Sequence, residues 1–300
     1  MITSQSKCYK PFRYPWAIEL TRLHEDAHWT EDEAKVGDDI DCWNNVLSDE
    51  ERSLVLNSLL LFTESDNVVG DNYATQLIPS VGAHEVRTML LSFAGREGTH
   101  KRAYALCNET LGLKDDFYSE FMRYREMSAK VEFMKASDIS TLRGRAMGFA
   151  RSCISEGVFL FGLFTVLMNM QRQGKMIGFG SINDWSIRDE SLHVEGNSTI
   201  FRTFLQEFHF LNCRSVHEEV YDLFNEAVAL EDVFIDFLFA SNLRKAVQGL
   251  SADELRMMIR ALADRRLMQL GLRPLYNVKN PIEWASLVFS GASVSNFFER

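Results

Sequence analysis

Apolar residues recur at the three- and four-residue spacing of α-helices along most of this chain, and no convincing alternating pattern indicates a strand. Capping boxes begin two of the predicted helices, at Ser48/Glu51 and Ser251/Glu254, and Gly112 is placed to end another. The first 45 residues lack this periodicity, so we expect an irregular arm there. The predicted helices cover residues 48–79, 85–111, 115–136, 142–173, a stretch after Gly180 that continues towards 208, 216–239 and 251–270.

The predicted helix over 142–173 is apolar nearly all round, above all from Val158 to Phe164, which is typical of a central, buried helix. One carboxylate, Glu156, lies in its apolar half. An unpaired buried carboxylate costs several kcal/mol or must be protonated, so Glu156 requires a partner.

Two Glu-x-x-His motifs, Glu97/His100 and Glu190/His193, each place a carboxylate and an imidazole on one helix face. Tyr104 lies one turn beyond His100 on that face. In a helix-rich chain this pattern predicts a four-helix bundle that holds two metal ions in its core, with one carboxylate from each of the other two helices.

Glu156 supplies one of those two carboxylates, and Asp66 (or Glu64) supplies the other. One imidazole per ion among several oxygens suits iron or manganese better than zinc or copper, and two ions about 3.5–4 Å apart can share bridging carboxylates. The predicted ligand sets are Asp66, Glu97 and His100 for one ion, and Glu156, Glu190 and His193 for the other. A third Glu-x-x-His, from Glu25 to His28, lies among polar residues of the arm and is interpreted as ordinary surface.

The composition of the chain limits which binding partners and which cellular compartment we expect. A net charge of −10 over 300 residues, with no basic cluster, argues against binding to nucleic acid or anionic membranes. The apolar run over 157–168 is shorter than the roughly 18 residues of a membrane span. Five scattered cysteines without a C-x-x-C pair fit a reducing cytoplasm. No linker-like stretch divides the chain, which predicts a single domain over 1–300.

The chain resembles a known family, the small, radical-generating subunit of class I ribonucleotide reductase. The resemblance covers nearly the whole chain. Three spacings carry the resemblance: 31 residues from Asp66 to Glu97, 34 from Glu156 to Glu190 and four from His100 to Tyr104. Three segments add to it, namely the RDExxH form of 188–193, the His28-Trp29 pair and the segment 280–284.

The resemblance implies a ferritin-like bundle in which two iron ions, or alternatively two manganese ions, activate dioxygen and oxidise Tyr104 to a stored tyrosyl radical. It implies a relay through His100, Asp189 and Trp29 to a large catalytic subunit that reduces ribonucleotides to deoxyribonucleotides. A homodimer is expected, together with an activating flavoprotein if the metal is manganese. Asp66 and Tyr104 argue against the mixed manganese/iron variant.

The chain also departs from the family. Leu160, Phe164 and Ser186 match the apolar wall around the radical, and the polar Ser186 predicts a shorter-lived radical. Members continue past a segment like Phe297-Phe298-Glu299 into a docking tail, which we expect to be missing here because the sequence stops at Arg300.

Two other classes of protein remain open. A ferritin-like oxidase or oxygenase would use the same six ligands without needing Tyr104 or the Trp29/Asp189 pair. A non-enzymatic helical interaction protein would need no metal at all.

Overall fold

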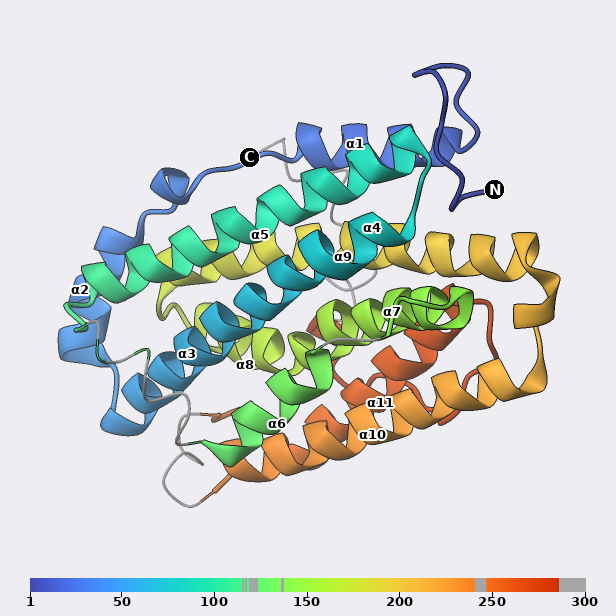
Figure 1. Ribbon diagram of the computed structural model, residues 1–300. Coiled ribbons are helices and arrows are strands. Elements are labelled where there is room, and N and C mark those ends of the chain that lie inside the picture. The colour runs from blue at the N-terminus through green and yellow to red at the C-terminus, as the bar shows by residue number, and fades with distance from the viewer. Residues whose placement is uncertain (115, 117, 119–123, 136–137, 241–246, 286–300) are drawn as a thin grey trace.

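Four long helical segments run side by side and form the core of the molecule (Figure 1). In the computed structural model, which describes residues 1–114, 116, 118, 124–135, 138–240 and 247–285, every regular element among the described residues is helical. The all-α bundle predicted from the sequence is therefore confirmed. The core segments are α3 (Asp49–Asn72), α5 (His84–Thr110), α7 (Leu142–Ile154) with η6 (Ser155–Phe159) and α8 (Phe161–Gln171), and α9 (Ile177–Glu207).

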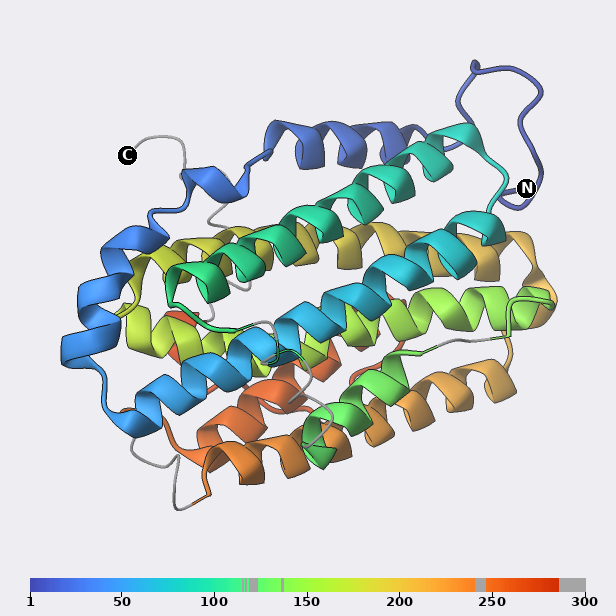
Figure 2. The same cartoon turned by 60° about the vertical axis from the view of Figure 1, so that its left-hand side comes forward.

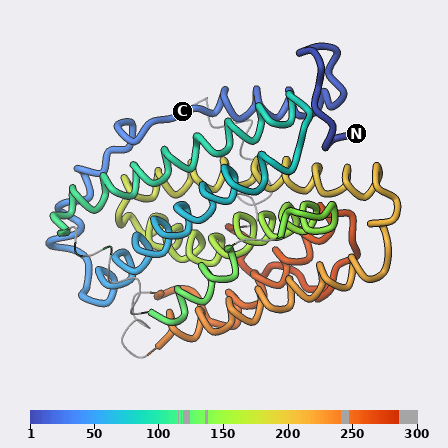
Figure 3. The backbone as a smooth tube through the Cα atoms, viewed as in Figure 1, coloured from blue at the N-terminus to red at the C-terminus, as the bar shows by residue number. Residues whose placement is uncertain are grey.

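Further helices cover this core on opposite sides, as the second view and the backbone tube also show (Figures 2 and 3). The helix α1 (Pro15–Asp26) lies along α5, whereas α6 (Arg125–Met134), α10 (Arg214–Leu238) and α11 (Ala252–Gln269) pack on the far side. The helix predicted over 115–136 is thus shorter than expected, and part of its range lies outside the described residues. Short elements connect the long ones: η1 (Glu31–Glu33), η2 (Val36–Asp38), α2 (Asp39–Asp41), η3 (Cys42–Val46), η4 (Tyr73–Leu77), α4 (Ile78–Ser80) and η7 (His209–Leu211).

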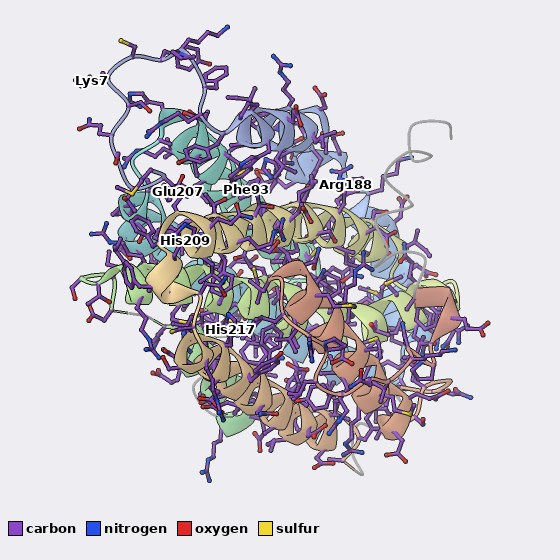
Figure 4. All side chains as sticks on the ribbon, turned by 90° about the vertical axis from the view of Figure 1, so that its right-hand side faces the viewer. Lys7, Phe93, Arg188, Glu207, His209 and His217 are labelled. Carbon is purple, nitrogen blue, oxygen red and sulfur yellow. The ribbon has the colours of Figure 1, made fainter. Side chains whose placement is uncertain are left out.

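The N-terminal arm is not irregular, which corrects the prediction from the sequence. Pro15 occupies the first turn of α1, where its missing N–H costs nothing, and Ala17 and His24, seven residues apart, are buried on one face. The segment before the helix is anchored as well, because the backbone N–H of Ile2 donates to the carboxylate of Glu207. Figure 4 labels Glu207 near the end of α9. The arm is therefore a structured layer over α5 and α9.

The apolar segment Leu142–Gln171 is long and apolar enough to cross a membrane by length and composition, yet the 18-residue stretch that meets this criterion is entirely buried within the fold. It is the central helix that the sequence predicted. It is not a single α-helix, however, because a π-helical turn, η6, interrupts it around Glu156. π-Helical turns are rare in proteins. Those that do occur are often at functional sites, because the extra residue redirects nearby side chains.

The helix α9 begins earlier than predicted because a distant carboxylate caps it. Asp39 accepts hydrogen bonds from the backbone N–H groups of Gly178 (3.0 Å) and Phe179 (2.7 Å). A carboxylate is favourable there because the first N–H groups of a helix have no partner within it. The cap holds the N-terminal end of the helix that carries the second Glu-x-x-His motif.

Candidate metal centre

The structure brings all six predicted ligand side chains into one buried cluster inside the bundle. Each is at most 2% exposed. Glu64, the alternative to Asp66, is half-buried and does not belong to the cluster. In each of two overlapping groups, one potential ligand atom per residue lies within 4.8 Å of all the others: Asp66, Glu97, His100 and Glu190, and Glu97, Glu156, Glu190 and His193.

Glu97 and Glu190 belong to both groups, and each faces both histidines. For Glu97, one oxygen lies 3.5 Å from His100 Nδ1 and the other 3.1 Å from His193 Nδ1. For Glu190, the two oxygens lie 3.4 Å from His100 Nδ1 and 3.4 Å from His193 Nδ1. Oxygens turned towards two separate histidines suit a carboxylate that bridges two metal ions. Glu156 faces His193 Nδ1 alone, at 3.1 Å.

The polar atoms of this cluster fit a pair of cations. Within the part of the chain that the structure describes, buried atoms without a hydrogen-bond partner include Asp66 Oδ2, both carboxylate oxygens of Glu97, Glu190 Oε2 and His100 Nδ1. Buried polar atoms are nearly always paired, so several unpaired ones in one place require an explanation such as an ion. Four carboxylates with two imidazoles form the hard, oxygen-rich donor set that iron and manganese accept.

Protonation balances the charges when no cation is present. Burial, and next the charge of Glu97, raises the pKa of Asp66 well above its usual range. Burial also raises the pKa of Glu156 to about 7. For His100 and His193 burial alone would lower the pKa, but hydrogen bonds to the surrounding carboxylates raise it well above its usual value. Metal ions must therefore displace protons when they bind.

Tyr104 lies in an aromatic environment close to this cluster. It is 1% exposed, and its hydroxyl donates to Ser186 Oγ at 3.1 Å. Phe62 stacks on its ring with centroids 5.1 Å apart, and Phe164 packs against Phe62. Leu160, the other predicted wall residue, is also buried. Burial raises the pKa of Tyr104 well above its usual value, so the phenol keeps its proton at neutral pH.

Asp189 joins the cluster to the N-terminal arm. One of its oxygens accepts from Trp29 Nε1 at 2.7 Å and lies 3.3 Å from His100 Nε2. Arg96 and Arg188 approach the same carboxylate at 3.7 and 3.6 Å. Although burial raises the pKa of Asp189, its hydrogen bond with His100 and the charges of His100 and the arginines hold it at about 2. Arg96 is buried and serves as a counter-ion here, a role that the sequence did not reveal.

Glu156 has a set of partners that the sequence did not predict. Its carboxylate accepts hydrogen bonds from the hydroxyls of Tyr73 (2.8 Å) and Ser152. Asn197 donates to both of these hydroxyls, at 2.8 and 2.9 Å. A cavity of about 10 Å³, enough for one water molecule, is lined by Ser152 and Glu156. Tyr73 and Asn197 come from other helices in no recognisable motif, whereas Ser152 lies four residues before Glu156 in the same helical segment, a spacing that was an available signal.

His24 was also missed, although a signal was present. Its Nε2 lies 3.1 Å from Nε2 of His193. The residues Ala17, Leu20 and His24 follow helical spacing, and this periodicity within the arm was the available signal. Burial lowers the pKa of His24 to about 2, which keeps its ring neutral. His28, at the end of the third Glu-x-x-His, is exposed, in line with its interpretation as surface.

Comparisons with known proteins agree with this arrangement. A solved ribonucleotide reductase R2 subunit from Clostridium botulinum superposes with a TM-score of 0.85 at 22% identity, over 96% of this chain and 93% of that one. A structure described as dimanganese(II)-NrdF of Streptococcus sanguinis superposes with a TM-score of 0.76 at 17% identity, over 96% of this chain and 98% of that one. These likenesses show that the fold is shared.

The sequence comparisons extend the likeness from fold to family. A probable ribonucleoside-diphosphate reductase small subunit of Invertebrate iridescent virus 6 is 33% identical over 329 residues, covering 97% of this chain and 91% of the relative. The model of the family described as ribonucleotide reductase, small chain, matches residues 6–281. The chain therefore belongs to the family of ribonucleotide reductase small chains.

Proposed function

We propose that Tyr104 stores an oxidising equivalent as a tyrosyl radical in this small subunit of ribonucleoside-diphosphate reductase, and that the six clustered side chains hold the metal ions. Family membership and the buried cluster together imply a dimetal site and a large catalytic subunit as partner. The observation that carries the proposal is that Glu97 and Glu190 each turn one oxygen towards each histidine.

The ligands divide naturally between two positions. Asp66 and His100 would serve one ion, Glu156 and His193 the other, and the two shared glutamates would bridge them. When bound, the ions supply the capacity to activate dioxygen, and thereby the oxidising power that a phenol requires.

The surroundings of Tyr104 suit a stored radical. Oxidation of the phenol removes one electron together with the hydroxyl proton, and the apolar walls keep water and reductants away from the ring. Ser186 then donates its own hydroxyl hydrogen to the phenoxyl oxygen, since the two oxygens are 3.1 Å apart. This hydrogen bond makes the surroundings of the radical more polar than a wholly apolar pocket. More polar surroundings favour a shorter lifetime of the radical.

A continuous path leads from the centre to the arm. Asp189 contacts both His100 and Trp29, and the Trp29 ring also stacks on the His100 ring with centroids 5.8 Å apart. We propose that these three residues relay the oxidising equivalent towards the large subunit. A ferritin-like oxidase has no use for such a path, so the arrangement favours nucleotide reduction. The relay predicts that Trp29→Phe keeps the radical but abolishes deoxyribonucleotide formation, measured with the purified large subunit.

The identity of the metal follows less directly from the ligands. The donor set accepts iron and manganese alike. We propose two iron ions. Two manganese ions are the alternative, because a structural neighbour is described as dimanganese(II). In the manganese case an activating flavoprotein would supply the oxidant. We also propose a homodimer and a cytoplasmic location. The five free cysteines support a reducing compartment.

One experiment tests the proposal as a whole. Metal-free protein is loaded anaerobically with Fe(II) or Mn(II) and exposed to oxygen, and metal content and electron paramagnetic resonance (EPR) spectra are recorded. We expect two ions per chain and, with iron, a tyrosyl signal. Two bound iron ions without any radical would instead favour an oxidase, and protein that binds neither metal would contradict the proposal entirely.

A further inference from the structure

His24 sits at the junction between the arm and the metal centre, and its ring has a polar neighbour on each side. It is 1% exposed. Its Nε2 lies 3.1 Å from His193 Nε2, and its Nδ1 lies 2.8 Å from Ser92 Oγ. The Ser92 hydroxyl in turn donates to the carboxylate of Glu25, which is exposed. These four residues form a hydrogen-bonded chain from the centre to the surface.

The donors and acceptors of these four residues allow every hydrogen bond to run in the same direction, from His193 to Glu25. His193 Nδ1 faces the glutamates, so this nitrogen must be unprotonated to bind a metal, and the proton of the neutral ring is on Nε2. That N–H then donates to His24 Nε2, which leaves the His24 proton on Nδ1, where Ser92 accepts it. Because Ser92 donates onward to Glu25, every group has a partner.

We propose that His24 is the positioning residue for His193, fixing its tautomer and ring orientation for metal binding. The outer partners of metal-binding histidines generally have this effect, and their loss typically lowers metal affinity about 10–100-fold. The inference rests on the proposed dimetal function and adds a residue from the arm to it.

The two histidines of the centre are held differently. His100 Nε2 contacts the carboxylate of Asp189 directly, at 3.3 Å. His193 Nε2 instead contacts the neutral ring of His24. The first carboxylate reached through these hydrogen bonds is that of Glu25, which lies beyond Ser92. A carboxylate partner raises the basicity of a histidine ligand more than a neutral partner does. We therefore infer that the His193 position binds metal more weakly and fills second.

Packing alone does not account for the contact. Phe93, labelled in Figure 4, touches both rings, with its centroid 5.0 Å from that of His24 and 4.5 Å from that of His193. An apolar side chain in place of His24 would preserve such packing but would leave the His193 N–H without an acceptor. Leucine and glutamine therefore separate the two roles, because a glutamine side chain can accept from His193 and donate to Ser92.

The test is an anaerobic Mn(II) titration in which EPR measures free Mn(II). We expect two unequal sites in the unaltered protein. The His24→Leu variant should weaken the second site about 10–100-fold and leave the first unchanged, and His24→Gln should restore the second. The exposed His209, labelled in Figure 4, provides the matched control His209→Leu, which should bind like the unaltered protein.

The outcomes distinguish this inference from the proposed function. Fewer than two sites in the unaltered protein would overturn both. Two sites there and unchanged affinities in folded His24→Leu would overturn the positioning role alone. If circular dichroism shows that His24→Leu does not fold, Ser92→Ala decides, because Ser92 is only half-buried. It removes the acceptor of the His24 N–H and should weaken the same site, whereas unchanged binding would contradict the proposal.

Discussion

Replacing Asp189 with asparagine tests the electrostatics that join the centre to the arm. Asparagine has nearly the same shape and keeps an oxygen that can accept from Trp29, but it removes a negative charge shared by three cationic or protonatable neighbours. Of the two arginines, Arg96 is the more buried, being 5% exposed, and it approaches Asp189 at 3.7 Å. Removing one partner of a buried ion pair costs about 3–5 kcal/mol. We expect the lower end, because Arg96 also donates to the backbone carbonyl of His24.

The assay is thermal unfolding of the metal-free protein at pH 7. A loss of about 3 kcal/mol in a chain of this size should lower the midpoint by roughly 5 °C. In the Mn(II) titration, the His100 position should weaken about 10–100-fold because its imidazole loses a carboxylate partner. Asp222→Asn, at an exposed position of α10, is the control and should change neither value. A destabilisation below about 1 kcal/mol, or unchanged binding at both positions, would refute the reasoning.

Three further predictions concern the centre itself. Tyr104→Phe loses one hydrogen bond, to Ser186, and should cost about 0.5–1.5 kcal/mol while keeping both metals but giving no tyrosyl signal by EPR; an undiminished signal would place the radical elsewhere. Glu97→Ala should abolish binding of two ions per chain by metal analysis, because Glu97 faces both histidines of the centre; two ions with unaltered spectra would show that the centre is misplaced. Burial raises the pKa of Glu156 to about 7, and the ligand histidines also have raised pKa values, so metal affinity should fall as pH drops through 7 and metal uptake at pH 7 should release protons. Calorimetry in two buffers of different ionisation enthalpy measures that release, and identical heats would contradict it.

Local patterns predicted much of the fold and the cluster, because helices are set largely by spacing and caps. Both capping boxes form as expected, and Gly112 ends α5 with a positive φ of 72°. The two Glu-x-x-His motifs could be placed because residues three apart share a helix face whatever the tertiary structure. Glu156 was recognisable because a carboxylate in an apolar helix must have a partner.

What could not be predicted depends on contacts between distant segments. The π-helical turn at Glu156 has no spacing signature in an apolar run. The early start of α9 needs the carboxylate of Asp39, more than 130 residues away in sequence. Tyr73 carries no motif, and its role becomes visible only where its hydroxyl meets Glu156. The helical spacing of Ala17, Leu20 and His24 could indicate that His24 is buried, but not that its ring meets His193.

The most direct test of the dimetal centre is anomalous X-ray diffraction from crystals loaded with iron or manganese, recorded at the absorption edge of each metal. We expect two anomalous peaks per chain, one beside Nδ1 of His100 and one beside Nδ1 of His193, with Glu97 and Glu190 between them. A single peak, no peak, or peaks away from these histidines would contradict it.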